Sequence, residues 1–260
     1  MTGFSTFTMT TSSIIASIIT LILLHLAPTS AMATPTQNAK AATKPTLGYW
    51  KIRGLASGIR YQLAYSNVPY DEEVYEQGDG PEFSRAAWYD VKHDQGLTYP
   101  NLPYLRDGSF SLTESGAIQR YCAKKWCPTL LCDDDMETYG KAEMAWGVVL
   151  DIKGFVATQC YVGDGDKKKL ADAAIPRFGL IAKELSENKF MIGDRICCAD
   201  FAFVELVEVM DFISDGEIFK VYPSLKAYRD RVFELPRLKE CLEDEKRLAF
   251  NNKVAKIGNM

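Results

Sequence analysis

The stretch GYWKIRG, residues 48–54, marks a change from one kind of secondary structure to another. The residues that lead into it, 46–50, predict a first strand. The residues that follow repeat their apolar side chains every four positions, which predicts a helix over residues 54–65 with one apolar face. Tyr49 is therefore expected at the end of a strand beside the start of a helix, where Gly54 allows the chain to approach closely.

The rest of the first half continues as short strands and helices. Alternating side chains over residues 73–76 predict a second strand, and the turn Asp107-Gly108 predicts a hairpin. The order βαβα followed by ββα predicts a compact α/β unit with a mixed four-stranded sheet. The remaining elements predicted in this half are a helix over 84–91, strands over 102–105 and 110–112, and a helix over 115–125.

After Pro128 only helical periodicity is present. The run over residues 201–210 is apolar nearly all round, which predicts a central buried helix. The chain is therefore divided into an α/β domain over residues 45–128 and an all-helical domain over residues 133–251. The predicted helices of the second domain span residues 136–160, 167–187, 198–213 and 224–233.

Residues 1–33 form a leader that contains no Asp, Glu, Lys or Arg. Its apolar run is too short to span a bilayer comfortably, which takes about 20 apolar residues. With Ala31-Met32-Ala33 behind it, the run predicts a signal peptide or organelle leader, followed by a linker over residues 34–44. The alternatives are an uncleaved single-pass anchor, or a cytoplasmic product whose true start is Met32.

Composition excludes several kinds of function. The net charge of −4 does not favour a nucleic-acid partner. The seven cysteines include no C-x-x-C pair, which argues against a disulfide framework, a zinc ribbon and a dithiol redox site. The only two histidines, His25 and His93, leave almost no material for a histidine-based metal site.

Three places in the α/β half carry candidate binding or catalytic residues. Tyr49 keeps its proton at neutral pH and could donate it to a thiolate, which lowers a thiol pKa from about 8.5. A cis bond before Pro103 would turn the backbone of Leu102 towards an extended peptide. Ser115 opens a helix, where free amides bind an anion, and Glu114 could pair with an amino group. On local grounds a packing tyrosine, a trans proline and a plain helix cap remain open alternatives.

Residues 45–126 closely resemble the N-terminal domain of mu-class glutathione transferases. Several short motifs occur in the family's order and at its spacing, and the helical half resembles the family's C-terminal domain more loosely. The resemblance implies a thioredoxin-like α/β domain followed by an all-α domain. The matching pieces are TLGYW with IRGLA, Gly78-Asp79 with Pro81, Arg85, Trp88, Lys92, Gly96-Leu97 and PNLPYL over residues 100–105.

The same resemblance implies a role for each matching residue. Tyr49 would be the catalytic residue and would hydrogen-bond the glutathione thiolate. The electrophile pocket would be formed by Trp50, Leu55 and Tyr161, and Tyr161 could donate a proton to some products. Glutathione would be held by Tyr49, Trp50, Arg85, Trp88, Lys92, Asn101, Leu102, Pro103, Glu114 and Ser115.

Three departures from the family pattern carry consequences. Glu114 stands where the mu class usually has glutamine, and glutathione binding should survive that change. Tyr99 replaces the phenylalanine that keys into the partner subunit, so its hydroxyl must find a partner or water. Cys197 replaces the Ser/Thr of a capping box, which would weaken that helix cap by about 1 kcal/mol.

The sequence therefore predicts a glutathione S-transferase that joins reduced glutathione to hydrophobic electrophiles. Glutathione is the co-substrate, no metal or prosthetic group is needed, and a homodimer is expected. The alternatives are a non-catalytic protein that binds hydrophobic ligands, or a glutathione-dependent isomerase or peroxidase on the same fold. A thiol-disulfide oxidoreductase is disfavoured, because no cysteine occupies the position of Tyr49.

Overall fold

The computed structural model describes residues 44–259, and the predicted leader lies outside these residues. The described chain begins with a mixed four-stranded sheet in the order β2-β1-β3-β4. Strand β1 is parallel to β2 and antiparallel to β3, which pairs with β4 as a hairpin. The predicted sheet is confirmed. Its strands are β1 (Thr46–Trp50), β2 (Asp71–Tyr75), β3 (Tyr104–Asp107) and β4 (Phe110–Thr113).

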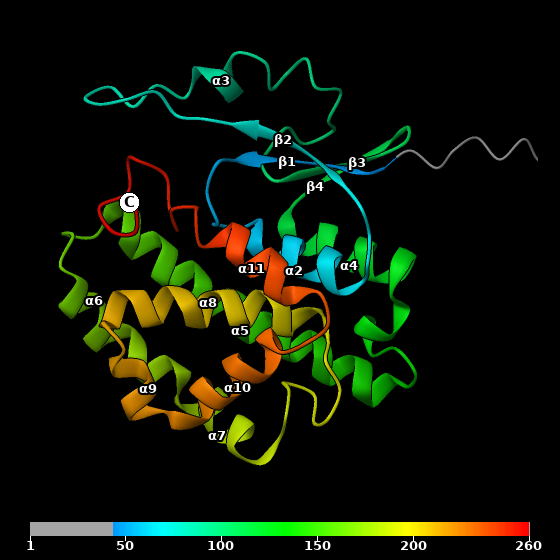
Figure 1. Ribbon diagram of the computed structural model, residues 1–260, viewed down its shortest axis with the longest axis vertical. Coiled ribbons are helices and arrows are strands. Elements are labelled where there is room, and N and C mark those ends of the chain that lie inside the picture. Colours follow the sequence, from blue (N-terminus) through cyan, green and yellow to red (C-terminus); the bar gives the residue numbers. More distant parts are fainter. Residues whose placement is uncertain (1–43, 260) are drawn as a thin grey trace, which may run out of the picture. The chain divides into compact units, whose positions relative to one another are not determined.

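Helices cover both faces of this sheet. Figure 1 shows α2 and α4 on the side that faces the rest of the molecule, and α3 on the other side. Apolar side chains from β1, β3, α2 and α4 form one core. Leu47, Ile59, Leu63 and Ile118 are fully buried in it. The helices are α2 (Ser57–Tyr65), α3 (Ala86–Tyr89) and α4 (Ser115–Trp126).

The second half is all helical, and helix α8 (Cys198–Ser214) lies at its centre. Most of its side chains are buried, including Phe201, Phe203 and Val207, as its continuous apolar run predicts. Helix α2 packs directly on α8, which joins the two halves. The other helices are α5 (Met136–Val162), α6 (Lys167–Ala174), α7 (Gly179–Glu187), α9 (Glu217–Val221), α10 (Pro223–Phe233) and α11 (Leu238–Glu245).

Two details of the helical half differ from the sequence prediction. The single helix expected over residues 167–187 is divided into α6 and α7 by a short 3-10 turn, Ile175–Phe178. Pro176 explains the break, because proline lacks the N–H that a continuous helix needs. The short helices α9 and α11 were not predicted. Neither is long enough to show a clear apolar period, although α11 buries Leu238 and Leu242.

The start of α8 forms a capping box in which Cys197 takes the place of serine or threonine. The carboxylate of Asp200 accepts the N–H of Cys197 at 2.8 Å and the N–H of Met191 at 3.0 Å. The hydroxyl of Tyr228 also donates to it, at 2.9 Å. Because three donors converge on this carboxylate, Asp200 supports the helix start at which Cys197 was expected to be a weak cap.

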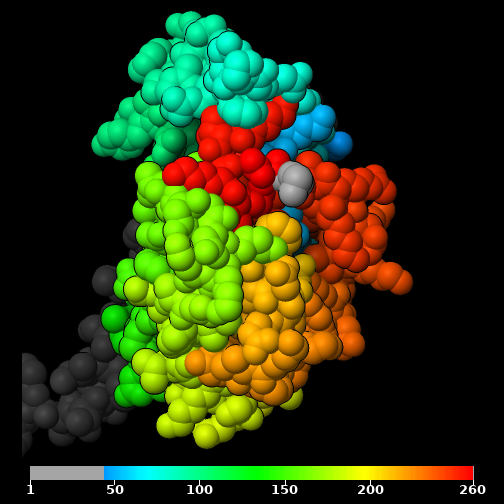
Figure 2. All heavy atoms as spheres, turned by 90° about the vertical axis from the view of Figure 1, so that its left-hand side faces the viewer, coloured from blue at the N-terminus to red at the C-terminus, as the bar shows by residue number. Residues whose placement is uncertain are grey.

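The C-terminal segment returns to the α/β half. Figure 2 shows its red atoms between the cyan atoms of the first half and the green atoms of the helices. The N–H of Arg53 donates to Ala249 at 2.8 Å, and the N–H of Lys256 donates to Cys160 at 2.8 Å. The segment is thus tied to both halves. Over the described part of the chain, no helix is both long and apolar enough to cross a membrane.

Candidate active site

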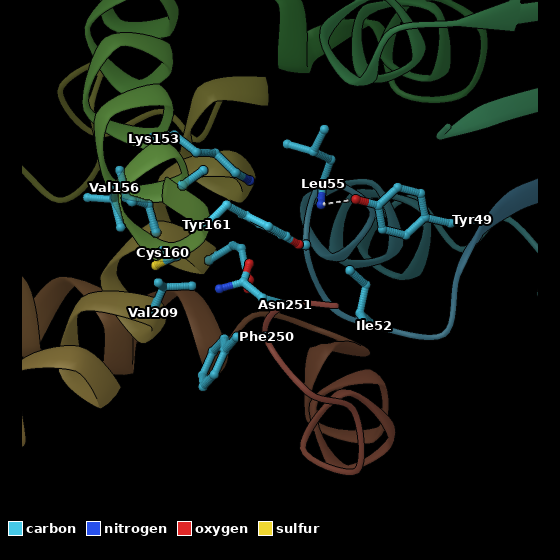
Figure 3. A pocket seen from close by; sticks show the side chains of 14 residues that line it. Tyr49, Ile52, Leu55, Lys153, Val156, Cys160, Tyr161, Val209, Phe250 and Asn251 are labelled. Atoms are coloured by element: carbon cyan, nitrogen blue, oxygen red, sulfur yellow. Dashed lines mark hydrogen bonds between the residues drawn. The ribbon is translucent and has the colours of Figure 1, made fainter. Parts of the chain in front are cut away.

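Tyr49 lies at the end of β1, and its side chain is almost fully buried. The backbone N–H of Leu55 donates to its hydroxyl oxygen at 2.9 Å (Figure 3). An oxygen that accepts this bond still carries its own proton, which it can donate to a further acceptor. The phenol is therefore held as a donor at the junction between the strand and α2.

Gly54 makes this arrangement possible. Its φ of +44° lies in the left-handed region, which glycine adopts without steric cost. A Cβ at this position would lie only 2.7 Å from the Tyr49 hydroxyl oxygen. A side chain here would strain the backbone and displace the hydroxyl, which explains the glycine in the sequence motif.

The electrostatics of the site keep Tyr49 protonated. Burial raises the pKa of Tyr49 well above its usual value, and the hydrogen bond from Leu55 lowers that pKa only in part. A phenol that holds its proton at neutral pH is a hydrogen-bond donor and not a base. The site can therefore stabilise an anion placed next to the hydroxyl.

A pocket of about 200 Å³ opens beside Tyr49. Tyr161 reaches into it from α5, and its hydroxyl oxygen accepts the N–H of Asn252 at 3.1 Å. Figure 3 shows the rings of Tyr49 and Tyr161 extending towards one another from opposite sides. The wall is mostly apolar and includes Ile52, Leu55, Val156, Leu206, Val209 and Phe250.

The residues expected to form the electrophile pocket are only partly brought together. Leu55 and Tyr161 line the pocket. Trp50 is not among its lining residues in the described structure, because its ring packs edge-on against Tyr75, with ring centroids 6.3 Å apart. Successive side chains on a strand point to opposite faces, so Trp50 leaves the sheet on the face opposite to Tyr49. The lining also includes Lys153, which no sequence motif marks.

The residues expected to bind the cysteinyl and γ-glutamyl parts of glutathione lie close together. The Leu102–Pro103 peptide bond is cis, one of the two alternatives that the sequence left open. Asn101 connects the two groups: its side-chain oxygen accepts the N–H of Leu102 at 2.9 Å, and its amide donates to Glu114 at 3.1 Å. Ser115 follows as the first residue of α4, so its free amide adjoins this polar cluster.

The residues expected at the glycyl end gather around α3. Arg85 and Lys92 both lie over the ring of Tyr89, at 4.8 Å and 5.1 Å from its centroid. Two cations on one aromatic ring make a positive surface that suits a carboxylate. Trp88 is different, since only 4% of it is exposed and its ring stacks on Tyr104.

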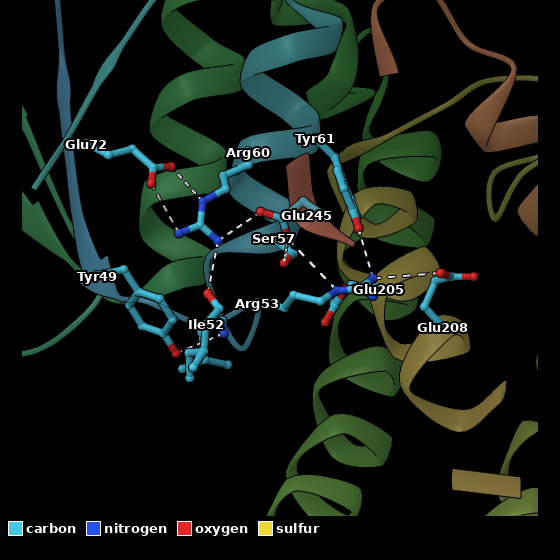
Figure 4. Close-up of polar contacts among 11 residues, drawn as sticks. Tyr49, Ile52, Arg53, Ser57, Arg60, Tyr61, Glu72, Glu205, Glu208 and Glu245 are labelled. Atoms are coloured by element: carbon cyan, nitrogen blue, oxygen red, sulfur yellow. Dashed lines mark hydrogen bonds and ion pairs between the residues drawn. The ribbon is translucent and has the colours of Figure 1, made fainter. Parts of the chain in front are cut away.

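A buried ion network lies behind the loop that carries Gly54, and no sequence motif marks it. The guanidinium of Arg53 contacts Glu205 at 3.2 Å and Glu208 at 3.8 Å. Arg60 contacts Glu245 at 3.0 Å and donates to the carbonyl of Ile52 at 3.1 Å (Figure 4). The network connects α2, α8 and α11, and so fixes the loop that positions Tyr49.

Comparison with known proteins identifies this architecture. Residues 45–124 match the family model of the glutathione S-transferase N-terminal domain, and residues 151–245 match that of the C-terminal domain. Glutathione S-transferase Mu 4 of Mus musculus is 33% identical over 82% of this chain and 98% of its own length. Glutathione S-transferase Mu 3 of Homo sapiens is 31% identical over 82% of this chain and 95% of its own length.

Solved structures agree with this match. The glutathione S-transferase Blo t 8 superposes with a TM-score of 0.74 at 26% identity, covering 82% of this chain and 99% of that one. The chain therefore belongs to the glutathione S-transferase family. Its sequence places it with the mu class, as the resemblance of the N-terminal motifs implied. Enzymes of this family use glutathione as a co-substrate and need no further cofactor.

Proposed function

We propose that this transferase activates glutathione through Tyr49 and joins it to hydrophobic electrophiles. The observation that carries the proposal is the 2.9 Å bond from the Leu55 N–H to the Tyr49 hydroxyl oxygen. It orients the phenol and leaves the phenolic proton available for a thiolate beside it. A donor of this kind stabilises the thiolate more than the thiol, so it lowers the pKa of the thiol.

Glutathione would then lie on the side of the site that the α/β half forms. The polar cluster of Asn101, Glu114 and Ser115 would take the γ-glutamyl end, and the backbone of Leu102 would pair with the cysteinyl part. Because the N–H of Leu102 already bonds to Asn101, the Asn101 side chain must turn away for that pairing to form. Trp50, Arg85, Trp88 and Lys92 are proposed for the glycyl end, with Pro103 setting the turn.

The electrophile would enter the apolar pocket between Tyr49 and Tyr161. Holding the thiolate and the electrophilic carbon next to each other removes much of the entropic barrier to their reaction. Burial raises the pKa of Tyr161, so this phenol is also protonated and able to donate to a developing oxyanion.

We also propose that the enzyme acts as a homodimer. Tyr99, at the position expected to key into a partner, has 75% of its surface exposed, and Met136 and Met144 are exposed on α5. Apolar side chains of this size on a surface often mark an interface. Entry into the secretory pathway or an organelle stays a prediction from residues 1–33, which lie outside the described residues.

Titration of the bound thiol tests the role of Tyr49. The ultraviolet absorbance of the thiolate, followed against pH in the enzyme–glutathione complex, gives the pKa of the bound thiol. We expect that pKa to lie below the free value of about 8.5 in the wild type, and to return towards it in Tyr49→Phe. Equal values in the two proteins would refute the proposed role.

A further inference from the structure

Lys153 is a basic side chain in the wall of a mostly apolar pocket. It comes from α5, eight positions before Tyr161, and is partly buried. Figure 3 shows its side chain extending from the helix towards Leu55 and the Tyr49 side of the pocket. An ammonium group is not expected here if the pocket accepts only uncharged hydrophobic molecules.

No ion pair or hydrogen bond joins the Lys153 side chain to another residue within 44–259. The nearby acids of α8 contact guanidinium groups, although Oε1 of Glu205, which also lines the pocket, has no hydrogen-bond partner in the described structure. Glu205 contacts Arg53 at 3.2 Å, and Glu208 contacts both Arg53 at 3.8 Å and Arg229 at 3.5 Å. No carboxylate lies within ion-pair distance of the Lys153 ammonium in the described structure, and Glu205 acts on it only at longer range.

Placing a cation without an ion-pair partner in a partly buried site costs free energy, and an anionic ligand can offset this cost. Burial lowers the pKa of Lys153, and the more distant charge of Glu205 opposes that effect. An anion bound directly to the ammonium would favour its charged form and form a charge-assisted hydrogen bond. Among the lining residues Lys153 is the one basic side chain and Glu205 the one acidic side chain, so a bound anion would have to contact Lys153 on the side away from Glu205.

The pocket has room for such a ligand. Its volume of about 200 Å³ exceeds the roughly 150 Å³ of an apolar cavity known to bind benzene. One substituted aromatic ring can therefore fit between the walls. With its electrophilic carbon at the Tyr49 side, such a ring could direct a substituent towards Lys153 (Figure 3).

We propose that Lys153 is a specificity-determining residue that binds a carboxylate on the electrophile. The enzyme would then prefer aromatic electrophiles that carry a carboxylate over the matching uncharged esters. The inference rests on the proposed function, because the electrophile must enter this pocket. Lys153 acts on the choice of substrate, and activation of the thiol is left to Tyr49.

A matched pair of substrates tests this preference. A chloro-dinitrobenzoate and its methyl ester react in the same way: the glutathione sulfur forms a bond to the ring carbon, and chloride leaves with the bonding electron pair. The thiol proton goes to solvent. The readout is the ratio of kcat/KM for the acid to kcat/KM for the ester, compared between variants, so that the intrinsic reactivities of the two compounds cancel.

Three variants make the comparison specific. Lys153→Met removes the charge while keeping the length of the side chain, and should lower the ratio by about tenfold. Lys153→Arg keeps the charge, so its acid-to-ester ratio of kcat/KM should stay close to that of the wild type. Lys141→Met removes an exposed lysine of the same helix and should leave the ratio unchanged. An unchanged ratio in Lys153→Met would overturn the proposal. It would indicate that Lys153 only offsets the negative charge of Glu205 at longer range.

A binding measurement on the wild type keeps the proposal falsifiable if Lys153→Met does not fold. The two glutathione conjugates, acid and ester, are prepared chemically and titrated into the enzyme in a calorimeter. The acid conjugate should bind about tenfold more tightly, and equal affinities would overturn the role of Lys153. If the wild type conjugates neither compound, the proposed function fails, whereas the two affinities still report on Lys153.

Discussion

The guanidinium of Arg53 contacts the carboxylate of Glu205 at 3.2 Å, although 152 residues separate them in the chain. Only 5% of the first side chain and 1% of the second are exposed. Arg53 lies two residues before Leu55, whose N–H holds the hydroxyl of Tyr49. Helix α8 therefore anchors the loop that orients the proposed catalytic phenol.

Glu205 should make the stability of the protein depend on pH. Burial raises the pKa of Glu205 to about 7, despite the opposing charges of Arg53 and Lys153. Between the unfolded pKa and this value the folded state holds a proton that the unfolded state has released. The contribution of Glu205 is therefore fully present below the unfolded pKa and is lost as pH rises towards 7.

Glu205→Gln isolates this contribution, because glutamine does not titrate. The free energy of unfolding of the wild type minus that of the variant should fall by up to about 3 kcal/mol as pH rises from about 4.5 to about 7. Urea denaturation at several pH values and one protein concentration measures it. A difference that rises with pH would contradict the predicted direction of the pKa shift.

Tyr49→Phe should lower the turnover of a chloro-dinitro-aromatic substrate by about tenfold or more, because the thiolate loses its donor. The affinity for glutathione should change little, since the peptide is held by other groups. Tyr139→Phe, which alters a tyrosine exposed on α5, is the matched control and should keep full turnover. Full turnover in Tyr49→Phe would remove the phenol from the mechanism.

Gly54→Ala should reduce both turnover and stability. The new Cβ would meet the Tyr49 hydroxyl oxygen at 2.7 Å, and the backbone at φ +44° disfavours alanine by about 1–2 kcal/mol. Gly140→Ala is the matched control, because a Cβ added there on α5 would meet no atom within 4 Å apart from the local helix backbone and its chain neighbours. That change should stabilise the protein by up to about 1 kcal/mol. Equal behaviour of the two variants in thermal unfolding would argue against the close approach at Gly54.

Glu114→Ala should weaken the binding of glutathione by about tenfold, because the amino group of the γ-glutamyl end loses a charged partner. Glu114→Gln should weaken it less, because an amide oxygen can still accept the bond that Asn101 donates at 3.1 Å. Calorimetric titration with glutathione measures both variants. An affinity that is equal in the wild type and Glu114→Ala would place the γ-glutamyl end elsewhere.

Local signals in the sequence were sufficient for much of the architecture. The strand before Tyr49, the helix after Gly54 and the hairpin at Gly108 each follow from periodicity or turn chemistry within a few residues. The apolar run of α8 predicted its central position in the same way. These elements depend on residues adjacent in the chain, so a pattern in the sequence can report them.

Contacts between distant segments were not visible in the same way. Trp50 adjoins Tyr49 in the chain, yet it packs on Tyr75 and does not line the proposed electrophile pocket in the described structure. Lys153 and Glu205 carried no motif, and only the packing of α5 against α8 brings both into the pocket.

The sequence by itself determined the order of the strands and of the longer helices, the glycine beside the Tyr49 hydroxyl and the family to which the chain belongs, because these depend on short motifs and local periodicity. The tertiary structure alone decided which side chains share the pocket and which charges stay unpaired within it. The physical reason is that burial and pairing depend on the direction in which each element presents its side chains to segments far away in the chain.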